Sequence, residues 1–187
     1  MARAREVPDL TCADPYALAA ARVLVIRADE LLEQASGVLD VSDIERVHDM
    51  RVASRRLRAA MEIFEPCFPR KEFRAALRDV KGIADALGER RDRDVAIVAL
   101  EKLAAKMAAS DRPGVEFLIE RLRGEQAAAN ESLAPLVAQQ RLAELHERLR
   151  RLSAAVEGPA EREERAEQAV EAGLDRPVRP LREEARA

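Results

Sequence analysis

The sequence is poor in the residues that build β-sheets and disulfide frameworks. Aromatic residues make up only 3%, there is no Trp, and the two cysteines are Cys12 and Cys67. Sandwich and barrel folds need aromatic and β-branched residues between frequent turns, so this composition excludes them. Two cysteines are too few for a disulfide framework, and they have no spacing typical of metal ligands.

Long hydrophobic runs are also missing. The sequence contains no stretch of about 18 apolar residues, which predicts that the chain has no transmembrane helix. The N-terminal residues lack the uninterrupted apolar segment of a signal peptide. We therefore expect a cytoplasmic protein that has no membrane partner.

The sequence is rich in charged and aliphatic side chains. Charged residues make up 36% and hydrophobic residues 48% of the 187 residues, which is typical of an all-α protein with a core of Ala, Leu and Val. We predict an antiparallel bundle of about five to seven helices over residues 14–157. Residues 1–13 are predicted to be a flexible N-terminus, and residues 158–187 a charged helix with a tail rich in Pro, Arg and Glu.

Start and stop residues predict where the second and third helices lie. Ser42 and Glu45 have the spacing of a capping box, in which their side chains satisfy the first backbone amides of a helix. We expect this second helix to end near Phe64. Gly88 is predicted to cap the end of a third helix, so that Arg91 follows a helix break.

Charge is distributed unevenly along the chain. Residues 46–93 hold thirteen Lys and Arg against eight Asp and Glu, whereas the remainder holds nineteen against twenty-seven. A net charge of −3 argues against indiscriminate coating of nucleic acid. The basic segment still predicts one local site for an anion.

The cations of this segment follow the helical period. On a helical wheel, His48, Arg51, Arg55 and Arg58 lie directly beside the predicted buried stripe of the second helix, while Arg56 lies alone on its outer side. Arginine stems that lie along an apolar surface with their heads in a groove favour binding of an anion with several charges.

The third helix repeats the arrangement. Arg74 and Lys81 lie at one shoulder of its apolar face, with Arg78 slightly further out. The two basic shoulders converge only if the helices pack antiparallel with the right handedness, which the sequence leaves open. The same pattern is also typical of a solvated, charged boundary beside a core, and this interpretation stays open as well.

Two blocks of the sequence resemble a known family. Residues 47–58 have the sequence VHDMRVASRRLR, and a second block combines Lys81 with Leu87-Gly88 and with RDRDV at residues 91–95. This pair of motifs is similar to the signature of the CHAD family, the "conserved histidine α-helical domain". The resemblance implies a helical bundle that binds inorganic polyphosphate through a basic groove without catalysis, and we expect no cofactor. Attachment to polyphosphate granules, control of phosphate storage and assistance to a separate phosphatase all stay open as consequences of binding. The positions that match the family's motifs are His48, Arg51, Arg55, Arg56, Arg58, Lys81 and Arg91.

A full-length family member has a second helical half that opens with a similar block. The candidate here is the segment around His146, which is poorer in the motif, and we interpret His146 as structural. A homodimer would supply a second basic face by two-fold symmetry. We assign Asp92 and Asp94 to helix capping and to holding the nearby cations in place.

Three other functions remain as alternatives. The dipeptide His48-Asp49 suggests a metal-dependent phosphohydrolase, although adjacent helical residues diverge by 100° and cannot chelate one ion alone. Nucleic-acid binding lacks aromatic side chains for base stacking. A helical scaffold for protein–protein interaction would use heptad-like apolar positions between Leu118 and Leu152.

Overall fold

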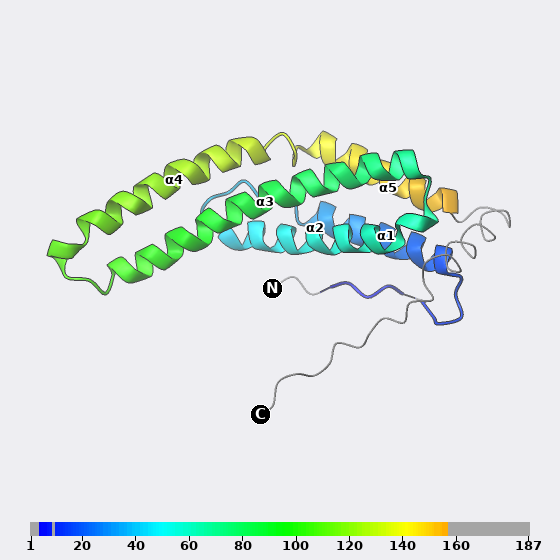
Figure 1. Cartoon of the computed structure of the whole chain (residues 1–187), viewed down its shortest axis with the longest axis horizontal. Coiled ribbons are helices and arrows are strands. Elements are labelled where there is room, and N and C mark those ends of the chain that lie inside the picture. The colour runs from blue at the N-terminus through cyan, green and yellow to red at the C-terminus, as the bar shows by residue number, and fades with distance from the viewer. Residues whose placement is uncertain (1–3, 9, 157–187) are drawn as a thin grey trace, which may run out of the picture.

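The computed structural model describes residues 4–8 and 10–156, and this part of the chain is all-helical, as the composition predicts (Figure 1). It contains five α-helices, in agreement with the predicted bundle. Two short 3₁₀ turns, η1 (Glu65–Cys67) and η2 (Ala109–Asp111), precede α3 and α4. The helices are α1 (Tyr16–Glu33), α2 (Ile44–Phe64), α3 (Arg70–Ala104), α4 (Pro113–Leu133) and α5 (Gln139–Val156).

Four of the helices, α1, α2, α3 and α5, form a bundle, and the second half of α3 extends from it to form an arm with α4. α1 packs against α2 and α5, α2 packs against α3, and α3 also contacts α5. The second half of α3 pairs with α4, and this hairpin projects beyond the ends of α1 and α2 (Figure 1). The predicted tail at residues 158–187 lies outside the described residues. Within the described N-terminal segment, the Arg5 side chain donates a hydrogen bond to Glu33 of α1.

The core of the bundle is aliphatic. Leu24 of α1, Leu57 of α2, Val80 of α3 and Leu149 of α5 are each at most 1% exposed and belong to one buried cluster. Full burial of a side chain of this size stabilises the folded state by roughly 1.5–3 kcal/mol. Alanines of α1 complete the cluster, because their small side chains let neighbouring helices approach closely. The bundle is therefore held by the Ala, Leu and Val residues that the composition singles out.

The predicted break after the third helix is wrong. α3 runs without interruption from Arg70 to Ala104, so Gly88 lies inside a helix and Arg91 lies on the same helix as Lys81. Glycine only weakly disfavours a helix, and the apolar face of this helix continues on both sides of it, so packing overrides the local stop residue. The residues before and after the predicted break therefore belong to one helix.

The predicted capping box of Ser42 and Glu45 is wrong, because the N-cap of α2 is one residue later and Glu45 is then the second residue of the helix. The N-cap of α2 is Asp43, whose side chain accepts a hydrogen bond from the backbone N–H of Glu45 at 3.3 Å. Ser42 lies in the preceding turn and donates its hydroxyl to Asp40 instead. Both Ser and Asp are good N-cap residues, and the turn geometry selects Asp43.

A buried ion pair within α3 connects this helix to α4. Arg90 and Asp94 are both fully buried, and Arg90 Nε donates to Asp94 Oδ1 at 3.1 Å. Two residues of α4 complete the network: Asn130 Oδ1 accepts from Arg90 Nη1 at 2.8 Å, and Gln126 Nε2 donates to Asp94 Oδ1 at 2.6 Å. Asn130 also donates to the carbonyl of Leu39, which anchors the loop before α2. The assignment of Asp94 to helix capping is therefore wrong, because it lies inside α3.

We expect Gly88→Ala to stabilise the protein by about 0.5–1 kcal/mol, because an added Cβ would meet only Arg51 Nε at 3.9 Å and alanine favours the helix. Urea unfolding measures the change. Gly37→Ala is the contrasting variant, since Gly37 has a φ of 71° and its Cβ would lie 3.1 Å from Arg46 Nη1. Destabilisation by Gly88→Ala would contradict the unbroken α3.

We expect Asp94→Ala to destabilise the protein by about 3–5 kcal/mol, because it leaves the charge of Arg90 buried without its partner. Thermal or urea unfolding measures the loss. Asp92→Ala is the matched control, since Asp92 is exposed on the same helix and should change stability by no more than about 0.5 kcal/mol. Equal effects of the two variants would contradict the buried pair.

Candidate anion-binding site

The antiparallel packing of α2 against α3 brings the two basic shoulders together. At one end, Arg91 Nη1 donates to the carbonyl of Ile44 at 2.9 Å. Further along, Arg51 reaches across to Gly88, where an added Cβ would lie 3.9 Å from its Nε. Residues later in α2 therefore contact residues earlier in α3, as expected for two antiparallel helices. The convergence that the sequence left open is therefore present in the structure.

We call this surface the basic seam. On α2, and from Arg74 to Lys81 on α3, its members are three or four residues apart, which places them on one face of each helix, and Arg91 lies ten residues further along α3. From Ile44 to Glu65 it follows about 30 Å of helix, at 1.5 Å per residue. The basic seam consists of His48, Arg51, Arg55 and Arg58 on α2 and of Arg74, Arg78, Lys81 and Arg91 on α3.

The cations at the ends of the basic seam are paired with carboxylates. Arg74 Nε lies 3.1 Å from Glu65 Oε1, and Arg91 Nη2 lies 3.4 Å from Glu45 Oε1. Pairs of this kind on the surface contribute only about 0–1 kcal/mol, so an incoming anion exchanges with them at little cost.

Arg58 and Lys81 share one acceptor. Arg58 Nε lies 3.0 Å and Lys81 Nζ 3.1 Å from Oε1 of Glu62. Hydrogen bonds from Arg58 and Lys81 lower the pKa of the Glu62 carboxyl. Glu62 therefore stays ionised at neutral pH and compensates part of the positive charge.

Arg51, Arg55 and Arg78 differ from their neighbours. Within the described part of the chain, none of the three guanidinium groups is paired with a carboxylate. Arg55 and Arg78 are exposed, and Arg51 is half-buried where it crosses toward α3. His48 is half-buried one turn before Arg51. Arg51, Arg55 and Arg78 hold the positive charge that the described carboxylates leave uncompensated.

Arg56 is the one predicted site residue that the structure does not bring together with the others. It lies roughly 140–160° round α2 from Arg51 and Arg58, by helical geometry. It also has an interaction of its own with another group of the protein. Arg56 therefore matches the family motif but does not belong to the basic seam.

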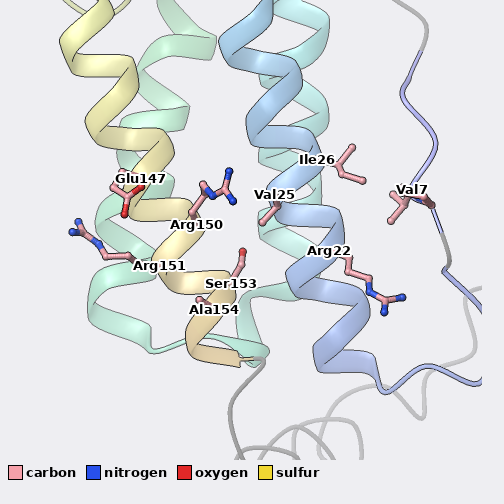
Figure 2. A pocket seen from close by; sticks show the side chains of 10 residues that line it. Val7, Arg22, Val25, Ile26, Glu147, Arg150, Arg151, Ser153 and Ala154 are labelled. Carbon is pink, nitrogen blue, oxygen red and sulfur yellow. The ribbon is translucent and has the colours of Figure 1, made fainter.

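A cavity lies elsewhere, between α1 and α5. It has a volume of about 590 Å³, and its lining includes Arg22, Val25, Ile26 and Arg150. Figure 2 shows Arg150 of α5 directed toward α1, with Val25 on the facing helix. None of this lining belongs to the basic seam, whose members lie on α2 and α3 and are all at least partly exposed.

The second His-and-Arg block holds helices together. His146 Nε2 lies 2.6 Å from Asp29 Oδ1, which ties α5 to α1. Arg148 and Arg141 both donate to Asp79 of α3, at 2.7 and 3.1 Å. The interpretation of His146 as structural is consistent with this contact.

Sequence reasoning did not find Arg90, whose pairing with Asp94 is described above. The only pattern that could have indicated it is the i,i+4 spacing of an Arg and an Asp, which is common on exposed helices too. Burial by α4 distinguishes this pair, and burial comes from tertiary packing.

Neither metal-binding nor membrane-spanning features are found in the described residues. No group of three His, Cys, Asp or Glu side chains among residues 4–8 and 10–156 is placed to hold a metal ion. None of the helices described is long and apolar enough to cross a membrane. Burial raises the pKa of the Cys67 thiol to about 11, so at neutral pH it is not a thiolate nucleophile.

The fold and the site define an all-helical protein that presents a row of cations along the packing line of two helices. The family model described as CHAD domain matches residues 22–187, and the chain therefore belongs to the CHAD domain family. This confirms the resemblance carried by the two motifs. Searches of curated proteins and of solved structures found no match.

Proposed function

We propose that this protein binds inorganic polyphosphate, without catalysis, along the basic seam. The observation that carries the proposal is the pair Arg51 and Arg55, which stand one turn apart on α2 with no carboxylate partner in the described residues. Like charges at this spacing repel each other, so a bound anion relieves a cost that the free protein bears. Membership of the CHAD domain family, which is associated with polyphosphate binding in general, supports the choice of ligand.

The chemistry of the side chains suits this ligand. Each internal phosphate of the polymer carries about one negative charge and offers two non-bridging oxygens. Arginine donates two parallel hydrogen bonds to such a group, and Lys81 adds a point charge. A row of cations about 15 Å long, from His48 to Arg58, matches a linear ligand with regularly spaced charges. Attachment to polyphosphate granules would follow from the same contacts.

We expect the double variant Arg51→Gln/Arg55→Gln to bind long-chain polyphosphate at least about tenfold more weakly, since each charge-assisted hydrogen bond contributes roughly 1.5–3 kcal/mol. By analogy with single-stranded nucleic acids, the slope of log K against log salt should shrink by about 1.4, or 0.7 per lost cation. Fluorescence or calorimetric titration at several salt concentrations measures both.

The matched control is Arg150→Gln/Arg151→Gln. It removes the same charge from α5, where neither guanidinium is paired with a described carboxylate. This control should keep most of the affinity, and circular dichroism should show unchanged helicity for both variants. Equal affinity of the seam variant and the unmodified protein would contradict the proposal.

A DNA titration and a phosphate-release assay separate the alternatives. DNA at matched phosphate concentration should bind more weakly than polyphosphate, because no aromatic side chain belongs to the basic seam. Release of phosphate from polyphosphate in the presence of Mg²⁺ or Mn²⁺ would favour the hydrolase instead.

A second candidate function, protein–protein interaction through the arm, has its own observation. Apolar side chains are exposed where α3 and α4 leave the bundle, with Phe117 69% exposed and Val95, Leu103 and Leu118 near half. Residues 97–126 hold five Lys and Arg against five Asp and Glu, so two copies of the arm meet without net repulsion. The partner of this candidate is a second copy of the chain, and a dimer would bring two basic seams into one particle.

We expect the protein to be a dimer at tens of micromolar and Phe117→Asp/Leu118→Asp to be a monomer, because the two substitutions place charge in the apolar contact. Light scattering of the purified proteins measures the mass. Val41→Asp, at an exposed apolar residue of the loop before α2, is the control and should stay dimeric. A monomeric unmodified protein would contradict this candidate and leave polyphosphate binding untouched.

A further inference from the structure

One carboxylate lies within the row of cations. Glu62 follows Arg58 by one turn of α2, and its Oε1 lies 3.0 Å from Arg58 Nε and 3.1 Å from Lys81 Nζ of the facing helix. A second acid, Asp85, is 3.9 Å from Arg58 Nη1 and is 73% exposed, so its contact is much looser. Glu62 is thus the main counter-charge for Arg58 and Lys81, in the part of the basic seam nearest its Arg74–Glu65 end.

The arrangement around Glu62 is that of a bound anion. A guanidinium N–H and an ammonium group converge on a single carboxylate oxygen, as they would on a phosphate oxygen. Its low pKa keeps the Glu62 carboxyl ionised at neutral pH, so the competition does not depend on small changes of pH. All three side chains are about 40% exposed, which leaves them accessible to a ligand.

The neighbouring cations are in a different state. Arg51 and Arg55 have no carboxylate partner in the part of the chain that the structure describes. The basic seam therefore divides into an open part at Arg51 and Arg55 and an occupied part at Arg58 and Lys81. A polyanion contacts the open part directly, whereas it reaches the occupied part only after the carboxylate has moved away.

We propose that Glu62 is a built-in competitor of the ligand, which occupies Arg58 and Lys81 in the free protein and lowers the affinity for polyphosphate. The inference rests on the proposed function of the basic seam. It assigns to Glu62 the role of setting affinity, in addition to any role in holding the two cations in position. Because the carboxylate belongs to the chain, its local concentration is fixed, and it lowers the apparent affinity for the ligand by a constant factor.

The test is the affinity of Glu62→Gln for long-chain polyphosphate. Glutamine keeps the size of the side chain but removes its charge, so Arg58 and Lys81 become available. We expect binding about three- to thirty-fold tighter, which corresponds to the loss of two exposed ion pairs. Glu89→Gln is the matched control: it makes the same change of charge on α3, next to Gly88, at a carboxylate that holds no cation of the described residues. It should change the affinity less than twofold.

A second comparison shows whether the effect passes through the two cations. In a protein that already carries Arg58→Gln/Lys81→Gln, we expect Glu62→Gln to leave the affinity unchanged, because no occupied cations remain to be released. A persistent gain in this background would overturn the inference, since it would reflect net charge alone.

The outcomes separate the two proposals. If Glu62→Gln binds polyphosphate no more tightly than the unmodified protein does, the role of Glu62 is overturned. The proposed function is still supported in that case, because both proteins bind polyphosphate. If Glu62→Gln binds polyphosphate and the unmodified protein does not, the competitor role is supported in its strongest form. Absence of binding in both proteins overturns the proposed function and the inference with it. Circular dichroism confirms that the variant is folded.

Discussion

The antiparallel packing of α2 against α3 is the constraint on which the rest of the structure depends. Val47, Leu57 and Met61 of α2 are fully buried in the same cluster as Val80 and Leu87 of α3. Burial of this apolar surface is the main favourable term that holds the two helices together. Since the cations lie directly beside the buried stripe on both helices, the same packing gathers them into the basic seam. The arrangement of charge is thus a consequence of where the apolar side chains lie.

The protein accommodates its positive charge in three ways. Arg90 is fully buried and is compensated by Asp94 and by the amide side chains of α4. Arg58 and Lys81 remain near the surface and share Glu62. Arg51 belongs to the third group, which the described carboxylates leave uncompensated. The first arrangement serves the structure, because a buried charge without its partner is very costly, and the last leaves charge for a ligand.

Much of the fold and of the candidate site follows from patterns that act locally. The period of the apolar residues predicts the helices, and it places Arg51, Arg55 and Arg58 on one shoulder of α2. The structure confirms where these three residues lie. Binding of polyphosphate by these residues stays a prediction. The errors lie where local preferences compete with packing. Gly88 resembles a helix cap in the sequence, but α3 continues through it because residues on both sides pack against neighbouring helices.

The sequence by itself determined the fold class, the family and the identity of the cations, because composition, helical period and motif spacing are properties of the chain alone. Only the tertiary structure decided which carboxylates oppose those cations. Glu62 lies four residues after Arg58 on one helix, so this contact can be read from the sequence. It contacts Lys81 only because α3 returns alongside α2. In the same way, Arg90 becomes a buried ion rather than a surface one when α4 covers it. Contacts between distant residues depend on register and handedness, which are set when the apolar faces pack.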